Sequence, residues 1–240
     1  RLSMEEANAF INARLHSAKL IAFGTWLCIM AVIPPLLSGI WIKQPFAESL
    51  GAIIAALIIA CAVAVIILNV FKLKAYEWIW NEPFETAYGI DGMVKERLQG
   101  FMPKFAVHIV IGVVLCIFAM AAFISSEFLP QLIRIETNAV IAVGIVFIAI
   151  AVYLFVSAGI SRGTYSMLLQ EESYHPDKKA LNRKITPFIA IYWLVATAAY
   201  LAYSFITMDW QKSWIIWPVA GVLFGALYIV LEVIFGKKDK

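Results

Sequence analysis

Six long segments that are almost free of charge constrain this chain more than any other feature of its sequence. Each holds 19 to 23 residues, and a helix of about 20 residues crosses the roughly 30 Å hydrocarbon core of a bilayer. A helix also satisfies its own backbone hydrogen bonds, which lipid cannot do. We therefore predict an all-α membrane protein with six transmembrane helices arranged as three hairpins. The segments are residues 20–42, 50–71, 105–124, 139–160, 188–206 and 214–235.

Composition supports the same class and argues against catalysis. Of the 240 residues, 62% are apolar and 15% are charged, whereas soluble domains are about half apolar and about a quarter charged. The three cysteines show no metal-ligand spacing, so we predict neither a disulfide nor a metal site. The sequence contains no HExxH motif, no glycine-rich phosphate loop and no nucleophile beside a base. We predict no catalytic residue, no cofactor and no enzymatic activity.

Basic residues predict the orientation of the chain. Sixteen of the 19 lysines and arginines lie in the N-terminal segment, the second and fourth connections and the tail, and three lie on the other side. The positive-inside rule then places both termini in the cytoplasm of a multi-pass protein of the cell membrane. The outer connections (43–49, 125–138 and 207–213) are short, and the inner ones (72–104 and 161–187) are long.

The first 19 residues predict an amphipathic helix. Ser3 and Glu6 form a capping-box pattern, and Arg14 and His16 lie off the apolar stripe that follows. The stripe recurs at helical spacing and consists of Ala7, Phe10, Ile11, Leu15 and Ala18. We expect residues 1–19 to form a cytoplasmic linker helix, on the membrane surface or against a partner. Residues 20–236 then form the membrane domain and 237–240 a basic tail.

The first two hairpins resemble each other. Residues 24–29 (GTWLCI) match 112–117 (GVVLCI) at an offset of 88, and Tyr76 matches Tyr165 at an offset of 89. We predict that these hairpins are parallel copies, as in some transporters, with a more divergent third hairpin. The alternative is that apolar segments resemble one another through composition alone.

Two groups of residues are candidates for a ligand cavity. Pro34 and Pro35 interrupt the first span, so this helix either ends early or forms a hinge that faces outward. Trp26 and Trp193 lie deeper, toward the inner half of the membrane, and together with Tyr192 they either pack or line a cavity for a small apolar or cationic ligand.

Two further features indicate helix contacts and a signal route. Gly221 and Gly225 share one face of the last span and predict a helix-packing face, which we expect to contact the fifth span. The loop 88–92 (YGIDG) has two glycines suited to a turn. We assign its residues Tyr88, Gly89 and Asp91, together with Glu6 and Arg14, to a cytoplasmic relay.

Several segments resemble one family. They are WQKSWIIWPVAGVLF at 210–224, IYWL at 191–194, YSFIT at 203–207, YGIDGMV at 88–94 and GVVLCI at 112–117. Together they resemble the C-terminal six-helix membrane domain of XRE-type helix-turn-helix transcriptional regulators of Gram-positive bacteria, over most of the chain. The resemblance implies a DNA-binding domain upstream of Arg1, so DNA is an expected partner only through that domain.

The leading hypothesis is a membrane-embedded sensor or anchor domain of a one-component transcriptional regulator, which acts as a homodimer because such domains commonly read paired half-sites. One alternative is a small permease-like transporter subunit. Another is a membrane accessory or immunity protein that acts by helix–helix binding.

Overall fold

The computed structural model describes residues 2–41, 46–81, 84–133, 136–171, 174, 176–208 and 210–236. These residues are helical apart from turns, short links and one isolated bridge pair. Six of the helices are long and apolar enough to cross a membrane, which confirms the predicted all-α membrane class. The chain divides into two compact units, Arg1–Glu171 and Glu172–Lys240, so the predicted membrane domain 20–236 is shared between them.

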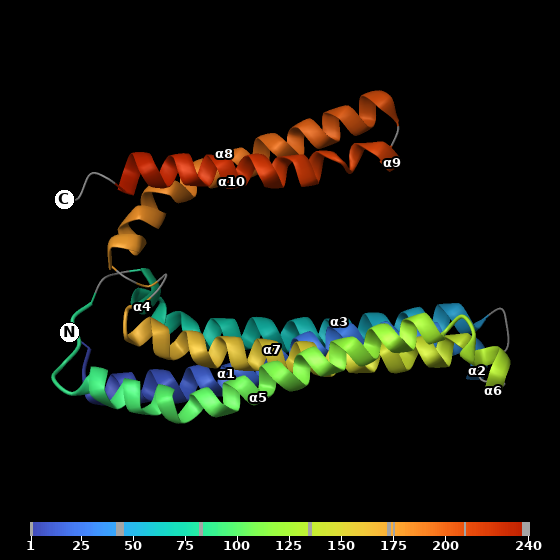
Figure 1. Cartoon of the computed structure of the whole chain (residues 1–240), viewed down its shortest axis with the longest axis horizontal. Helices are drawn as coiled ribbons and strands as arrows, with labels where there is room; N and C mark the ends of the chain where they lie inside the picture. Colours follow the sequence, from blue (N-terminus) through green and yellow to red (C-terminus); the bar gives the residue numbers. More distant parts are fainter. Residues whose placement is uncertain are drawn as a thin grey trace. The chain divides into compact units, whose positions relative to one another are not determined.

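Unit 1 contains the first two predicted hairpins, and unit 2 contains the third (Figure 1). Unit 1 consists of α1 (Met4–Met30), α2 (Ile33–Trp41), α3 (Phe46–Leu73), the 3₁₀ turn η1 (Lys74–Tyr76), α4 (Glu77–Asn81), α5 (Ile90–Ser125), α6 (Leu129–Ile133) and α7 (Thr137–Leu168). Unit 2 consists of α8 (Pro176–Thr207), α9 (Trp210–Ser213) and α10 (Ile216–Gly236).

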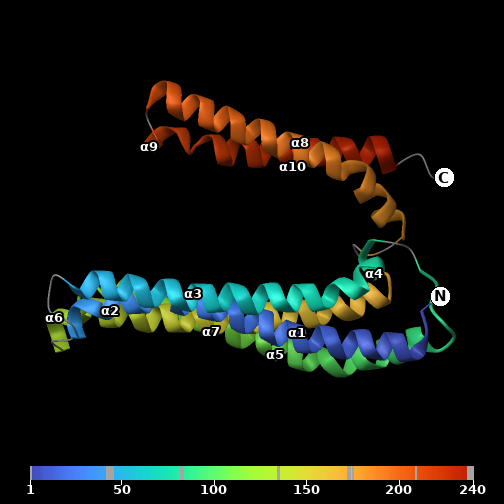
Figure 2. The ribbon, with the colours of Figure 1, turned by 180° about the vertical axis from the view of Figure 1, so that it is seen from behind.

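The four long helices of unit 1 pack in the order α3–α1–α7–α5. Helix α1 contacts both α3 and α7, and α7 in turn contacts α5 (Figures 1 and 2). This is the order expected when a second hairpin stacks beside the first by translation. Each hairpin also has an equivalent close contact at a glycine: Gly24 of α1 faces Ile66 of α3, and Gly112 of α5 faces Phe155 of α7. The contact supports the repeat, which stays a prediction.

The first span is interrupted just before its two prolines. Helix α1 ends at Met30, a turn occupies Ala31 and Val32, and α2 completes the segment. Pro34 and Pro35 lie in the first turn of α2, where the missing N–H groups have no helical partner to lose. The corner packs against α3, since a Cβ atom on Gly51 would lie 2.7 Å from the Cα atom of Pro35. Of the two predicted alternatives, the structure therefore has the early helix end, and the short helix α2 completes the span.

Helix α1 joins the predicted linker helix and the first span into one element. It runs without interruption through residue 19, and the predicted capping box of Ser3 and Glu6 is present. The predicted stripe is buried at Ala7, Phe10, Ile11 and Ala18 and partly buried at Leu15. Because the protein covers this stripe itself, the helix does not lie separately on a membrane surface.

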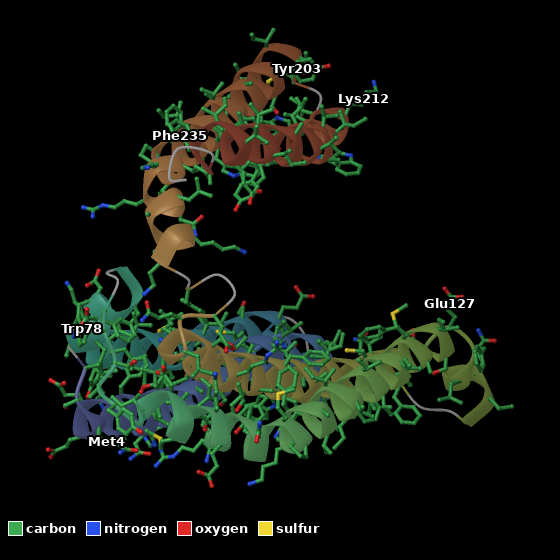
Figure 3. The ribbon with its side chains drawn as sticks, turned by 60° about the vertical axis from the view of Figure 1, so that its left-hand side comes forward. Met4, Trp78, Glu127, Tyr203, Lys212 and Phe235 are labelled. Carbon is green, nitrogen blue, oxygen red and sulfur yellow. The ribbon has the colours of Figure 1, made fainter. Side chains whose placement is uncertain are left out.

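One end of unit 1 contains a core of large side chains. We call this end the collar, and it comprises residues 2–15, 73–81, 84–94 and 161–171. Met4 and Trp78 mark it in Figure 3, with Glu127 at the opposite end of the unit. Among the described residues of unit 1, the largest fully buried side chains all belong to the collar. They are Leu2, Phe10, Ile11, Ile79, Ile90, Val94, Thr164, Met167 and Leu168.

Along the apolar segments, by contrast, the helices meet through small residues. The buried positions at this level include Ala22, Gly24, Ala31, Ala62, Gly112, Ala119, Ala142, Gly144, Ala149, Ala151 and Ala158. Large side chains such as Leu57, Leu68 and Val110 point outward and are each more than 60% exposed. This pattern is typical of helices packed in lipid, where small residues permit close approach.

Unit 2 is a helical hairpin held by aromatic side chains. Helix α8 begins at Pro176, so the charged segment before the fifth span is helical. Helix α10 packs along α8, and the two meet at a cluster of Tyr192, Trp193, Trp217 and Phe224.

Candidate functional site

The segment ahead of α1 is hydrogen-bonded to the loop that precedes α5. The N–H of Leu2 donates to the carbonyl of Glu85 (2.8 Å), and the N–H of Ala87 donates to the carbonyl of Leu2 (3.1 Å). Leu2 and Thr86 thus form a parallel bridge pair, and the Leu2 side chain is fully buried. The start of the chain is therefore fixed to the collar through both backbone and side-chain contacts.

The predicted turn at residues 88–92 forms at its first glycine. Gly89 has φ +88° and caps the N-terminus of α5, a conformation that favours glycine, whereas Gly92 is already helical. Tyr88 is 99% exposed. Asp91 is exposed in the first turn of α5, where a negative charge interacts favourably with the helix dipole.

The other two predicted relay residues lie on α1. The Ser3 backbone N–H donates to the Glu6 carboxylate (2.9 Å). This bond and that from the Ser3 hydroxyl lower the pKa of Glu6, which lies in the exposed start of α1, ahead of the apolar segment. The Arg14 guanidinium lies 6.0 Å from the ring centroid of Phe10, at the limit of a cation–π contact. The five relay residues are thus spread over the collar and do not converge on one point.

Sequence reasoning missed Gln170, which links the end of α7 to the same loop. Its backbone has φ +50°, and the N–H groups of Gln170 and Glu171 donate to the carbonyls of Met167 and Ser166. This is the Schellman arrangement that ends a helix, usually with glycine at the left-handed position. The side-chain Nε2 of Gln170 donates to the carbonyl of Phe84 (2.7 Å). No sequence signal marks a glutamine for this role.

A cavity of about 450 Å³ lies between α1, α5 and α7. It adjoins the collar on the side of the apolar segments. Its polar lining carries three basic side chains, an imidazole, two hydroxyls and a phenol: Lys19, Arg97, Lys104, His108, Ser157, Ser161 and Tyr165. The rest of the lining is Leu15, Gly100, Phe101 and Ala158. One feature of the sequence could have indicated this cavity: Lys19 and Lys104 each directly precede a predicted span.

A second cavity, of about 820 Å³, lies on the other side of α1. It is mainly apolar, with charged residues at one end, and is lined by Arg14, Ile21, Ile66, Ile67, Val70, Phe71, Leu73, Lys74 and Glu77. Of the predicted relay residues, Arg14 alone lines it. Beyond its charged end, the rest of this groove between α1 and α3 is lined by apolar side chains.

The predicted ligand-cavity residues fall into both units, and neither cavity described above is lined by any of them. In unit 1, Trp26 stacks on Phe23 at 5.5 Å between ring centroids, and the two prolines pack against Gly51 as described. In unit 2, Trp193 lies 5.3 Å from Phe224, and the Tyr192 hydroxyl donates to the carbonyl of Ala220.

The prediction that the glycine face of α10 contacts the fifth span is wrong. Both Gly221 and Gly225 are exposed, and a Cβ atom on either would meet no described atom within 4 Å. Helix α10 instead turns Ala220 and Phe224 toward α8, where the Tyr192 hydroxyl donates to the carbonyl of Ala220 and the Tyr192 ring packs with that of Phe224. The glycines remain a predicted packing face only for a helix other than α8.

Comparisons with protein-family models, with curated proteins and with solved structures find no match to this chain. Among the described residues, no three histidine, cysteine or acidic side chains group as metal ligands would. The site is therefore defined by its geometry: a multi-pass helical unit, a collar that fixes the first residues, and a basic cavity beside it.

Proposed function

We propose that this chain is the membrane-embedded sensor or anchor domain of a one-component transcriptional regulator, with its DNA-binding domain upstream of Arg1. One observation carries the proposal. The backbone of Leu2 is bonded to the loop 85–87, and α1 continues from there as one helix into the middle of unit 1, where it contacts α3 and α7. A rearrangement of these helices would therefore move the segment that joins the two domains.

Two further considerations support the proposal. Five segments resemble the membrane domain of XRE-type regulators, as described above. The distribution of basic residues favours a cytoplasmic collar with both termini inside, where a DNA-binding domain must lie. In this arrangement the collar residues Glu6, Arg14, Tyr88, Gly89 and Asp91 lie between the membrane helices and the upstream domain, and a homodimer would read paired half-sites.

Operator binding by the full-length protein in nanodiscs tests the proposal. We expect binding that changes when a candidate envelope-active compound, apolar or cationic, is added. Unchanged binding with every compound would leave an anchor without a sensor, and absence of DNA binding would refute the regulator.

A coupling variant sharpens the same experiment. Leu2→Pro removes the N–H that donates to Glu85, so DNA binding should persist while the response to the compound is lost. Phe128→Ala is a suitable control because this side chain is 57% exposed and lies outside the collar. If Leu2→Pro responds to the compound as Phe128→Ala and the wild type do, the collar does not transmit the signal.

A permease-like transporter is the second candidate, and the break in the first span at Ala31 and Val32 favours it. Discontinuous helices form the substrate sites of many transporters. Solute flux into proteoliposomes that contain the purified protein discriminates the two functions. A third candidate, an accessory or immunity protein that binds a membrane partner, is supported by the open face at Gly221 and Gly225.

A further inference from the structure

The 450 Å³ cavity between α1, α5 and α7 is strongly basic. Lys19, Arg97 and Lys104 line it, and none of the described lining residues is a carboxylate. All three basic side chains are exposed, so they are available to a ligand at the mouth of the cavity. Basic side chains around a cavity without carboxylates in its lining favour binding of an anion. Phosphate oxygens are suitable acceptors for arginine and lysine.

The floor of the cavity is polar and buried. Ser161, Tyr165 and Ala158 are each less than 10% exposed. The Ser161 hydroxyl donates to the carbonyl of Ser157 (2.7 Å), whereas the Tyr165 hydroxyl forms no hydrogen bond with another described residue. This phenol is thus a further donor at the base of the site, while the apolar ring of Phe101 packs against it, 5.9 Å between centroids.

The position of the cavity along the helices identifies the kind of anion. Lys19 directly precedes the predicted span 20–42, Lys104 directly precedes 105–124, and Ser161 directly follows 139–160. Three helices therefore place their lining residues at the level where apolar segments end, which is the level of lipid headgroups. On α5, Val107 and Ile111 continue from this level as an exposed apolar surface, close to the helix face that carries Lys104.

We propose that this cavity binds the phosphate-bearing headgroup of an anionic phospholipid. Lys19, Arg97 and Lys104 contact the phosphate, and the acyl chains lie along Val107 and Ile111. Basic pockets between transmembrane helices suit such headgroups. A soluble phosphate would use the same cations but would gain nothing from the apolar surface. The inference does not rest on the regulatory function, because a lipid site of this kind could serve any of the three candidate functions.

Lipid titration of the purified full chain in detergent tests the inference, with bound lipid counted by native mass spectrometry. The probes are phosphatidylglycerol and phosphatidylcholine with identical acyl chains, and inorganic phosphate alone. We expect phosphatidylglycerol to bind at least about tenfold more tightly than phosphatidylcholine, and phosphate alone to bind weakly. Equal affinity for the two lipids would overturn the site, and tight binding of phosphate alone would show a soluble anion in place of a lipid.

Two kinds of variant locate the binding. Arg97→Gln with Lys104→Gln should weaken phosphatidylglycerol binding about fivefold for each cation removed, whereas Lys95→Gln, on the same helix but outside the cavity, should not. Gly100→Leu keeps every charge and adds bulk at the cavity wall, where a Cβ atom would meet no described atom within 4 Å.

Gly92→Leu is the matched control for that change, since Gly92 is equally open but does not line the cavity. Gly100→Leu should reduce binding of phosphatidylglycerol and Gly92→Leu should leave it unchanged. If the cavity variants bind as the controls do, the lipid lies elsewhere and the inference is wrong.

Discussion

The collar and the apolar segments of unit 1 are built from the same helices but packed in opposite ways. In the collar, Phe10, Ile90 and Met167 are fully buried. Further along the same helices, the buried positions are Gly24, Ala119 and Ala151, and the large side chains face outward. Each helix therefore changes the size of its buried residues along its length.

The difference in packing indicates which solvent surrounds each region. In water, burial of large apolar side chains stabilises a fold by about 25 cal/mol per Å², so the collar gains from phenylalanine and isoleucine. In lipid there is no such gain between helices, and contacts depend on close approach. The buried residues change from large to small near Lys19 and Lys104. This boundary comes from packing alone, without any hydropathy threshold, and it agrees with the predicted span boundaries.

Truncation of a collar side chain should have the largest effect. Phe10 is fully buried, and its ring packs 5.3 Å from that of Tyr76. Phe10→Ala should lower the free energy of unfolding by about 3 to 5 kcal/mol, measured by denaturant titration in detergent. Phe128→Ala is the control, because Phe128 is 57% exposed. A small effect at Phe10 would mean that burial of large apolar side chains from water does not stabilise the collar.

Enlargement of a small residue should have the next largest effect. A Cβ atom on Gly51 would lie 2.7 Å from the Cα atom of Pro35 and 3.1 Å from the carbonyl oxygen of Pro34, and backbone atoms move only with the helix. Gly51→Ala should therefore destabilise the protein by about 1 to 3 kcal/mol. Gly39→Ala, on α2, meets no described atom within 4 Å and should be neutral or slightly stabilising. Equal stabilities of the two variants would contradict close packing at the corner.

Substitution of Gln170, which links α7 to the loop before α5, should have a smaller effect on the free energy of unfolding. Two variants separate the contribution of its side chain from that of its backbone. Gln170→Ala removes the hydrogen bond to Phe84 and retains the left-handed backbone, which should cost about 1 kcal/mol. Gln170→Gly removes the same bond but relieves the backbone strain, so it should be more stable than the alanine variant by about 1 kcal/mol. Unfolding in detergent measures the difference, and the opposite order would refute the assigned helix end.

Much of this fold could be predicted from the sequence because lipid imposes simple rules. Apolar length predicted the six helices, and the Ser3–Glu6 pattern predicted the start of α1. The positive φ of Gly89 followed from turn chemistry. These features depend on local sequence, where propensity and hydrogen bonding act over a few residues.

The candidate site was less predictable because it depends on contacts between distant segments. The bonds of Leu2 with residues 85–87, and of Gln170 with Phe84, join parts of the chain more than 80 residues apart. Neither pair has a local signature. The cavity residues Arg97 and Ser161 likewise become neighbours only when α5 packs on α7. Span boundaries placed each residue at the right level, but not beside its partners.

The smallest effect is expected on α10, where small residues lie outside any described contact. Gly221→Ala and Gly225→Ala each add a methyl group to open space, and alanine is the better helix former. The free energy of unfolding should therefore stay within about 0.5 kcal/mol of the wild type. Light scattering of the purified protein in detergent gives the second readout, the oligomeric state. Loss of an oligomer without loss of hairpin stability would show that small residues on α10, like those in unit 1, serve close contact between helices, here with another chain. If both readouts are unchanged, small residues on a lipid-facing helix do not by themselves mark a contact, and the rule drawn from unit 1 holds only for positions that are already buried.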